Sequence, residues 1–300
     1  MTKRRIVISE FMDERAVAQL QAVHDVLYDP ALVDDPLRLL SECVSAEALI
    51  VRNRTQVRGE LLAALRRCRV VGRLGVGLDN IDVAGCEAMG LPVVPATGAN
   101  AASVAEYVIT AALMLLRGAY AASDDVAAGR WPRMALSNGR ELAGKTLGLV
   151  GCGAIGRLVA QKAEALGLQV LVSLSRRVPG AIPLDELLAR SDVVSLHVPL
   201  ADETRGLLDA GRIATMKRGA VLINTARGGL VDEAALAAAL RSSALGGAAL
   251  DVFEHEPLPL APHFQGCPNL LLTPHVAGVT VESNERVSFM IAEAVLKALA

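Results

Sequence analysis

The sequence predicts a protein of the α/β class, in which helices cover both faces of parallel β-sheets. Short runs of leucine and β-branched residues alternate with alanine-rich helical stretches along almost the whole chain, and this alternation is typical of parallel strands joined by helical crossovers. The chain has 300 residues and 52% hydrophobic content, and single cores usually stop growing near this length. We therefore expect two α/β domains.

Five strands are predicted in the first hundred residues, and helical stretches separate them. Each strand is short and rich in valine, isoleucine or leucine, as expected when both faces of a parallel sheet are covered. The strands cover residues 6–9, 26–28, 48–51, 70–74 and 92–94. Together they predict one five-stranded unit, a flavodoxin-like α/β domain.

A long helical stretch over residues 100–128 is predicted to cross into the second domain. Six further strands follow it, at residues 146–150, 168–174, 193–198, 220–226, 248–253 and 270–273. After them only one helix remains, over roughly 281–299, and a lone terminal helix must bury its apolar face on a partner surface. We place it on the first domain. One domain is then residues 1–98 with 281–300, and the other is residues 99–280.

Composition excludes several classes of protein. The formal net charge of -2 and the pI near 6.2 provide no overall attraction to nucleic acid or anionic lipid. The most apolar helical stretch, residues 108–116, is too short to span a bilayer. The five cysteines are scattered without CxxC spacing, and no His/Asp/Glu cluster has the spacing of metal ligands. These features favour a protein of the reducing cytoplasm with a small-molecule ligand and no metal.

The stretch TLGLVGCGAIGRLVA combines a strand, a glycine-rich turn and the start of a helix. Gly151, Gly153 and Gly156 have GxGxxG spacing. In this motif the first glycine permits a tight turn, the second lets the backbone approach a pyrophosphate, and the third lets the helix pack closely on the strand. The helix N-terminus, with Ala154 and Ile155, would face the anion. The turn predicts a Rossmann-type dinucleotide site, and a tight turn without a ligand is the alternative interpretation.

The strand after the glycine turn ends in the sequence VLVSLSRR, without a carboxylate. NAD sites carry Asp or Glu about 20 residues beyond the glycines, where it accepts hydrogen bonds from the ribose hydroxyls. Here the corresponding residues are Leu174 and Ser175, followed by Arg176 and Arg177. Because a hydroxyl and guanidinium groups can bind the extra phosphate that a carboxylate would repel, the sequence favours NADP over NAD. The alternative is that the arginines are solvated surface charge.

Polar side chains follow three later strands of the predicted second sheet. Arg227 comes after LINTA, Glu256 after ALDVFEH, and His275 after LLLTP. Ligands of open α/β sheets bind beyond the carboxyl ends of the strands, so we expect these three groups near the nicotinamide. Each alone has an ordinary interpretation, as a turn arginine, an acid before Pro257 and a histidine at a strand end.

Together the three side chains match the requirements of ketone reduction. Hydride transfer to a carbonyl carbon leaves negative charge on oxygen, which a proton donor neutralises and a fixed cation stabilises. We assign His275 as the proton donor in reduction and the acceptor in oxidation. Glu256 would hold the ring and favour its charged form, and Arg227 would bind the substrate carboxylate and polarise the carbonyl. The substrate is then a 2-keto or 2-hydroxy acid.

Over nearly its whole length the sequence resembles the D-isomer-specific 2-hydroxyacid dehydrogenases, the family of phosphoglycerate dehydrogenase and glyoxylate/hydroxypyruvate reductase. Seven stretches carry the resemblance, in order along the chain: RLGVGLDNID (73–82), ANAASVAEYV (99–108), GKTLGLVGCGAIG (144–156), SLHVPLADETRGLL (195–208), MKRGAVLINTARGGLVDEAAL (216–236), ALDVFEHEP (249–257) and NLLLTPHVAG (269–278). The resemblance implies that Arg227, Glu256 and His275 are the family's catalytic Arg, Glu and His. It also implies that the first domain binds the substrate.

The resemblance implies further contacts with the cofactor and the substrate. The residues implied to contact the nucleotide are His197, Val198, Pro199, Thr204, Thr225, Ala226 and Asp251. Among them Thr225 and Ala226 would lie near the nicotinamide ribose, and Asp251 would face the carboxamide. Val76 and Gly77 would supply backbone donors for the substrate carboxylate. The missing strand-end acid departs from the family pattern and puts the NAD preference in doubt, but not the reaction.

Arg52 and Arg54 follow a first-domain strand and would lie on one face of an extended chain. Similar arginines of phosphoglycerate dehydrogenases contact the distal phosphate, so the resemblance implies a second anionic group on the substrate; an exposed basic strand end is the alternative. ISEFMDE (8–14) and VRNRTQVRGELL (51–62) most resemble the sulfolactate dehydrogenase-like branch, whose sulfonate would also suit two arginines. Phosphoglycerate, sulfolactate, hydroxypyruvate and glyoxylate all stay open as substrates.

Two further expectations concern the class of protein and its partners. A nucleotide-sensing, corepressor-like binding protein would need the glycine turn but not all three catalytic groups, so the presence of all three favours an enzyme. The helical stretch over 100–128 has more apolar surface than one domain needs. We therefore predict a homodimer formed around it.

Overall fold

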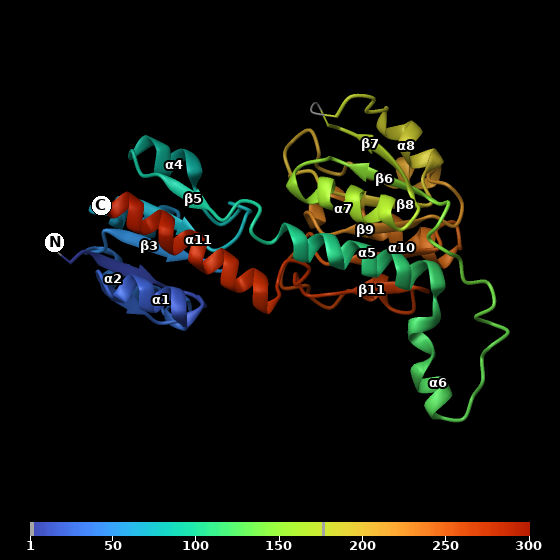
Figure 1. Ribbon diagram of the computed structural model, residues 1–300, viewed down its shortest axis with the longest axis horizontal. Helices are drawn as coiled ribbons and strands as arrows, with labels where there is room; N and C mark the ends of the chain where they lie inside the picture. Colours follow the sequence, from blue (N-terminus) through green and yellow to red (C-terminus); the bar gives the residue numbers. More distant parts are fainter. Residues whose placement is uncertain (1–2, 176–177) are drawn as a thin grey trace. The chain divides into compact units, whose positions relative to one another are not determined.

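The computed structural model describes residues 3–175 and 178–300, which fall into two compact units. Unit 1 consists of residues 1–100 and 279–300, and unit 2 of residues 101–278. Each unit contains a parallel sheet accompanied by helices (Figure 1), which confirms the predicted α/β class. The domain boundaries predicted from the sequence, 98/99 and 280/281, lie two residues from these divisions.

The sheet of unit 1 has five parallel strands in the order β2-β1-β3-β4-β5. They are β1 (Arg5–Ile8), β2 (Asp25–Tyr28), β3 (Ala48–Val51), β4 (Val70–Arg73) and β5 (Val93–Pro95), close to the five predicted strands. The whole of β3 is buried, in keeping with its uninterrupted apolar sequence ALIV. Because the strands are parallel, the segments that follow β1, β3 and β4 leave the sheet at the same edge.

The helices of unit 1 include the last helix of the chain, which packs on the first sheet. Ile291 and Val295 are fully buried in a core shared with β1, β3 and β4. A Cβ on Gly72 of β4 would lie 2.6 Å from Ile291, so the absence of a side chain there lets the helix approach the sheet. The helices are α1 (Glu14–Gln21), η1 (Leu32–Asp34), α2 (Pro36–Cys43), α3 (Gly59–Ala64), α4 (Val83–Ala88) and α11 (Val281–Leu299).

The sheet of unit 2 has six parallel strands in the order β11-β10-β9-β8-β6-β7. The strand order reverses at β6, which is where open α/β sheets bind ligands. The strands are β6 (Thr146–Val150), β7 (Gln169–Ser173), β8 (Val193–Leu196), β9 (Val221–Asn224), β10 (Gly247–Leu250) and β11 (Leu270–Leu272).

Helices cover both faces of this second sheet. One apolar core joins a face of the sheet to α5 (Ala101–Arg117) and α7 (Ala154–Ala165). A second core joins the other face to α8 (Leu184–Arg190), α9 (Ala210–Thr215) and α10 (Glu233–Arg241). The remaining helical segments of the unit are η2 (Ala119–Ala122), α6 (Ser123–Ala127), η3 (Gly228–Leu230) and η4 (Pro262–Phe264).

Two details of the predicted elements are wrong. The helix predicted over 100–128 is interrupted, because Gly118 has φ of +64° and ends α5 in the left-handed conformation typical of a helix C-terminus. Several predicted strands also end two or three residues early: β8 stops before His197, β9 before Thr225 and β10 before Asp251. These polar residues lie in the loops beyond the strands, where they can reach a ligand.

Among the described residues, no helix is both long enough and apolar enough to cross a membrane.

Candidate active site

The glycine turn between β6 and α7 packs closely against the loop after β8. Gly151 has φ of +90°, a conformation that favours glycine. A Cβ on Gly151 would lie 2.7 Å from the carbonyl oxygen of His197 and 2.8 Å from Cγ1 of Val198. A Cβ on Gly156 would lie 2.7 Å from the carbonyl oxygen of Gly151. Contacts inside unit 2 therefore require glycine at the first and third positions of the motif.

Gly153 is different, because a Cβ there would meet no neighbouring segment of the described chain within 4 Å. This residue is the N-cap of α7, and no described side chain caps the helix. Open space beside the N–H groups of a first helical turn suits a diphosphate. The buried hydroxyl of Thr225 has no hydrogen-bond partner among the described residues, which a hydroxyl of a ligand would satisfy. The turn and this hydroxyl fit a dinucleotide, which would supply a hydride when bound.

The loop after β8 contains predicted nucleotide contacts that also stabilise the loop itself. Nε2 of His197 lies 3.0 Å from Oγ of Ser195. Burial lowers the pKa of His197 to about 4, so its ring is neutral at physiological pH. The hydroxyl of Thr204 donates to the carbonyl of Pro199 at 2.7 Å and accepts the N–H of Ala201 at 2.8 Å. Thr204 thereby closes the loop on which Pro199 lies.

The end of β7 carries the residues predicted to select the cofactor. Leu174 has φ of +50° and is exposed, and Ser175 is partly buried. Together with Ser173 and residues 181–184 they line a cavity of about 500 Å³, and none of these lining residues has a carboxylate. The predicted Arg176 and Arg177 lie outside the described residues.

Arg227 lies in a turn after β9 that the side chain of Asn224 closes. Asn224 is fully buried; its Nδ2 donates to the carbonyl of Arg227 at 2.8 Å, and its Oδ1 accepts the N–H of Ala226 at 3.0 Å. Such turns are typical of asparagine, whose side chain mimics a backbone group. The next residue, Gly228, packs so closely that a Cβ would lie 1.8 Å from the carbonyl carbon of Phe253. The turn carrying Arg227 is therefore held against the loop after β10.

The structure contains the predicted hydrogen bond between Glu256 and His275. Oε2 of Glu256 lies 2.6 Å from Nδ1 of His275, and Oε1 accepts the backbone N–H of Phe253 at 3.0 Å. The carboxylate thus holds the imidazole from one side and is itself anchored to the backbone. Nε2 is then the ring nitrogen that can exchange a proton with a substrate.

The electrostatics of Glu256 connect all three predicted catalytic residues. Burial raises the pKa of this carboxyl, but the hydrogen bonds from His275 and Phe253 and the charges of His275 and Arg227 outweigh burial. Its pKa therefore lies below the usual value, and the group is ionised at neutral pH. The structure brings Arg227, Glu256 and His275 together at the carboxyl ends of three neighbouring strands, β9, β10 and β11.

Asp251 holds the segment that presents His275. The backbone of His275 has φ of +56°, which is uncommon for a residue with a side chain. The carbonyl of Asp251 accepts the N–H of His275 at 2.9 Å, and its carboxylate accepts the N–H groups of Val276 and Ala277, both at 2.8 Å. Asp251 is 1% exposed. These bonds keep the unusual backbone conformation in place. The prediction that Asp251 faces the nicotinamide carboxamide did not include this structural role.

Tyr107 and Thr273 complete this arrangement, and sequence reasoning missed both. The hydroxyl of Thr273 lies 2.6 Å from Oδ1 of Asp251, and because a carboxylate accepts hydrogen bonds, this hydroxyl is the donor. Tyr107 of α5 lies 2.5 Å from the same hydroxyl oxygen and must donate to it. The TPH sequence at 273–275 marks Thr273 as a neighbour of the site, whereas nothing local distinguishes Tyr107.

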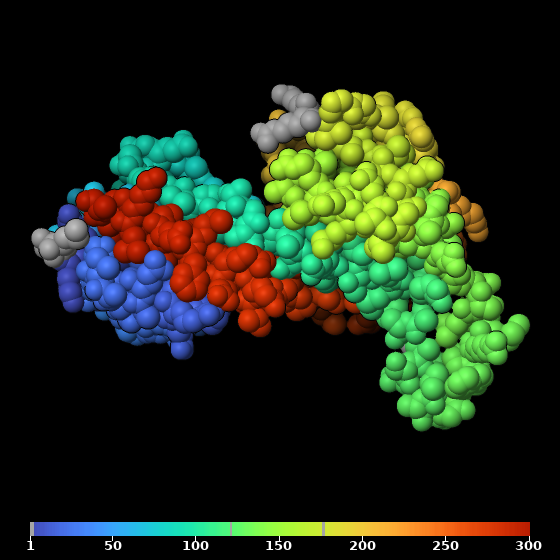
Figure 2. All heavy atoms as spheres, viewed as in Figure 1, coloured from blue at the N-terminus to red at the C-terminus, as the bar shows by residue number. Residues whose placement is uncertain are grey.

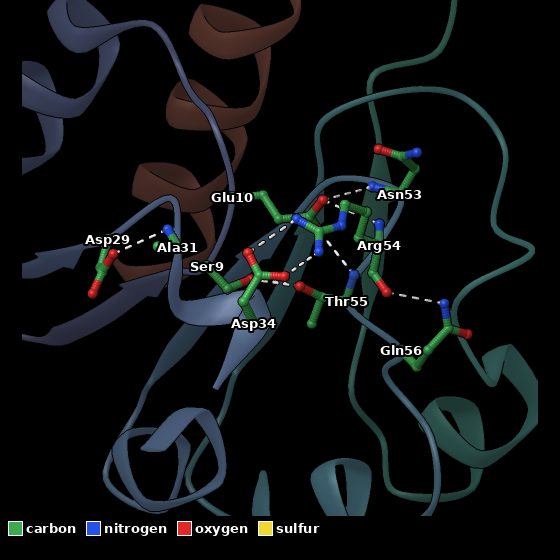
Figure 3. Close-up of polar contacts among 9 residues, drawn as sticks. All are labelled: Ser9, Glu10, Asp29, Ala31, Asp34, Asn53, Arg54, Thr55 and Gln56. Carbon is green, nitrogen blue, oxygen red and sulfur yellow. Dashed lines mark hydrogen bonds and ion pairs between the residues drawn. The ribbon is translucent and has the colours of Figure 1, made fainter. Parts of the chain in front are cut away.

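The expectation that Arg52 and Arg54 share one face of an extended chain is wrong. These residues form a turn after β3, so the alternation of side chains along a strand does not apply. Nη2 of Arg52 donates to Oδ1 of Asn284 at 2.8 Å, and the guanidinium lies 5.8 Å from the ring centre of Phe11. Arg54 instead forms an ion pair with Asp34 (Figure 3). The two guanidinium groups therefore have different partners.

The predicted substrate residues of unit 1 come from two loops that Asn80 ties together. Val76 and Gly77 lie in the loop after β4, and Val76 is 39% exposed. Nδ2 of the buried Asn80 donates to the carbonyls of Arg52 at 3.3 Å and Thr55 at 2.7 Å. Asn80 lies inside the matching stretch RLGVGLDNID, but its bonds join segments that only the folded sheet brings together.

Comparisons with known proteins agree with this geometry. The family model for the NAD binding domain of the D-isomer specific 2-hydroxyacid dehydrogenases matches residues 109–277. The (S)-sulfolactate dehydrogenase of Chromohalobacter salexigens is 54% identical over 303 residues, which cover 98% of each chain. The hydroxypyruvate reductase of Thermotoga maritima is 34% identical over 308 residues, covering 100% of this chain and 99% of the relative. A glyoxylate reductase from Paecilomyes thermophila superimposes with a TM-score of 0.87 at 30% identity, covering 100% of this chain and 96% of that chain.

Proposed function

Because the chain belongs to the D-isomer-specific 2-hydroxyacid dehydrogenase family, we propose that Arg227, Glu256 and His275 carry out its hydride-transfer reaction. The chain is an NAD(P)-dependent D-2-hydroxyacid dehydrogenase. The observation that carries the proposal is the 2.6 Å contact between Glu256 and His275, within reach of the charge of Arg227. The relatives named above are dehydrogenases and reductases, not nucleotide-sensing corepressors.

The three side chains divide the work of keto-acid reduction. The glycine turn and Thr225 would hold the dinucleotide, which would supply the hydride for C2 of the keto acid. Protonated His275 gives its Nε2 proton to the carbonyl oxygen, which becomes the hydroxyl of the product, and the Glu256 carboxylate stabilises the imidazolium before the transfer. Arg227 binds the substrate carboxylate and stabilises the charge that develops on the oxygen. In oxidation, neutral His275 accepts the hydroxyl proton.

A substrate panel with both cofactors tests this assignment. Glyoxylate, hydroxypyruvate and sulfopyruvate would each be assayed with NADPH and NADH, for the wild type and for His275→Ala. We expect turnover by the wild type and a loss of about 10³-fold in kcat for the variant, because the general acid is removed. Tight cofactor binding without turnover of any 2-keto acid would instead favour a nucleotide sensor.

We further propose that the enzyme prefers NADP to NAD. Leu174 and Ser175 directly follow β7, where an NAD site carries an acid, and the lining of the adjacent cavity contains no carboxylate among its described residues. We expect Leu174→Asp to lower the NADPH/NADH ratio of kcat/KM by about tenfold through repulsion of the extra phosphate. Leu37→Asp, at an exposed leucine of unit 1, is the control. Arg176→Asp tests the arginine in the same assay, and an unchanged ratio in both cofactor-site variants would contradict the preference.

The substrate that we propose is a 2-keto acid with a second anionic group, with sulfopyruvate as the first candidate. The relative at 54% identity is named (S)-sulfolactate dehydrogenase, and the carbonyl of Arg52 accepts a hydrogen bond from Asn80 of the loop that carries Val76 and Gly77. The S label agrees with D-type geometry, because the sulfur-bearing carbon outranks the carboxyl carbon in naming. Hydroxypyruvate is the second candidate, on the name of the Thermotoga relative. The ratio of kcat/KM values decides between them.

We also propose a homodimer formed around α5, α6 and the segment after them. Large apolar side chains are exposed along this region, with Trp131 76%, Met134 83% and Val126 47% exposed. Figure 2 shows the atoms of α6 and the segment after it, in green, standing clear of the rest of unit 2. Such exposure in one segment favours association. We expect light scattering to report a dimer that the double variant Trp131→Ser, Met134→Ser weakens; a wild-type monomer at micromolar concentration would contradict the proposal.

A further inference from the structure

Glu10 is a buried carboxylate that accepts hydrogen bonds from the backbone N–H groups of the turn formed by residues 52–55. It follows β1 and is 4% exposed. Its Oε1 accepts the backbone N–H groups of Arg52 at 2.8 Å and Thr55 at 3.0 Å. Its Oε2 accepts those of Asn53 at 3.3 Å and Arg54 at 3.1 Å. Figure 3 shows three of these four successive residues, Asn53, Arg54 and Thr55, beside the carboxylate.

The Glu10 carboxylate occupies a turn whose N–H groups could otherwise bind an anion from solution. Successive N–H groups that converge on one point form a concave site for an anion, and here a side chain of the protein fills it. The carbonyls of Arg52 and Thr55 on the other side of the turn accept hydrogen bonds from Asn80. The hydroxyls of Ser9 and Thr55 are 2.9 Å apart. The backbone of the turn is therefore held from both sides, which determines the directions in which its side chains leave.

The side chains of the two arginines of the turn contact partners of different charge, one a carboxylate and the other a neutral amide. Arg54 pairs with the carboxylate of Asp34, and both side chains are 58% exposed. Arg52 donates to the neutral amide oxygen of Asn284, and no carboxylate of the described residues forms an ion pair with its guanidinium. The charge of Arg54 is thus neutralised at contact, whereas the charge of Arg52 is held in place without a contacting anion.

We propose that Glu10 is a positioning residue for substrate selection. Its carboxylate accepts the hydrogen bonds of the four N–H groups of the turn, so no other anion can bind them. The fixed turn then directs the guanidinium of Arg52 toward a second anionic group of the substrate, a sulfonate or a phosphate. This inference rests on the proposed function. Glu10 does not contact the substrate; it acts through Arg52, while Arg54 stays paired with Asp34.

The experiment compares a keto acid with two anionic groups and one with a single anionic group. The measured quantity is the kcat/KM of sulfopyruvate divided by that of glyoxylate. In Glu10→Gln the amide keeps one acceptor oxygen, but its NH₂ group faces two N–H donors, so half of the turn is released. We expect the ratio to fall about tenfold, mainly through a higher KM for sulfopyruvate. Glu10→Asp, which keeps the charge but withdraws it by one methylene, should lower the ratio less.

Glu47→Gln is the matched control. Glu47 directly precedes β3, whereas the turn bound by Glu10 directly follows that strand. The side chain of Glu47 is 15% exposed and forms an ion pair with Arg4 at 2.8 Å. Its replacement removes a partly buried carboxylate from unit 1 and should leave the substrate ratio unchanged. Hydrogen exchange adds a readout that does not depend on activity, because the amides of Asn53 and Arg54 should exchange about tenfold faster in Glu10→Gln than in the wild type or the control.

The possible results separate this inference from the proposed reaction. A folded Glu10→Gln enzyme with the wild-type ratio overturns the inference. So does an active wild type without preference for sulfopyruvate, although the proposed reaction then stands. If Glu10→Gln does not fold, the ratio of Glu10→Asp decides, and failure of both variants to fold would assign Glu10 a purely structural role. A wild type that reduces no 2-keto acid would remove both proposals.

Discussion

Thr273 donates its hydroxyl hydrogen to Oδ1 of Asp251 across 2.6 Å, and this bond links a helix to the candidate proton donor. The same carboxylate oxygen accepts the N–H of Val276, the residue after His275. On its other side Thr273 accepts from Tyr107 of α5. The position of His275 therefore depends on a chain of hydrogen bonds that begins outside its own loop.

Tyr107→Phe should lower kcat three- to tenfold with little change in KM, as order-of-magnitude values for a lost supporting hydrogen bond. The ring keeps its packing, but Thr273 loses the donor that sets its rotamer, so the Asp251 carboxylate and the backbone after His275 become less constrained. Steady-state kinetics on the best keto acid measures the effect. Tyr120→Phe, for a second partly buried tyrosine of unit 2, is the control. Wild-type kcat in Tyr107→Phe would show that the chain of hydrogen bonds is unimportant for the reaction.

Glu256→Gln should lower kcat for reduction by about 10²-fold. Although burial raises the pKa of Glu256, its hydrogen bonds and neighbouring charges depress it below the usual value, so the carboxylate is ionised throughout the neutral range. A neutral amide cannot favour the protonated imidazole in this way. Steady-state kinetics of reduction at pH 7 measures the effect. A wild-type kcat in the variant would argue against the electrostatic role of this carboxylate.

Gly228→Ala should destabilise the protein by about 2 kcal/mol or more and reduce activity, because the new Cβ would lie 1.8 Å from the backbone carbon of Phe253. The loops that carry Arg227 and Glu256 must then separate. Gly229→Ala is the matched control, since its Cβ would lie 3.2 Å from the end of the Leu200 side chain, which can move. Denaturant unfolding and kcat/KM are measured for both. Equal stability of the two variants would contradict the described packing.

His197 should make the folded state less stable as the pH falls from about 6.5 to about 4. Burial lowers its pKa to about 4, whereas the unfolded chain takes up the proton near 6.5. Between these values the unfolded state binds more protons, so stability decreases on acidification, by roughly 2 kcal/mol in total for a ring that keeps some solvent contact. His197→Asn should remove this component from the curve of unfolding free energy against pH. Parallel curves for the wild type and the variant would refute the prediction.

Some of the site could be predicted because it is local or follows from parallel strands. The strands and the glycine turn depend on short patterns of apolar residues and on GxGxxG spacing, which act over a few neighbours. Arg227, Glu256 and His275 could be placed together because each follows a strand, and parallel strands end at the same edge of a sheet. The break of α5 at Gly118 was missed because an isolated glycine marks a helix end only weakly.

The sequence by itself determined the α/β class, the succession of strands along the chain and the residue types at their carboxyl ends, since all of these come from local periodicity and spacing. Only the tertiary structure decided which side chains support them. Tyr107 meets Thr273 across 166 positions, Arg52 meets Asn284 across 232, and Glu10 meets Thr55 across 45. Hydrogen bonds over such separations depend on how helices and loops pack on the sheets, and no local pattern encodes that packing.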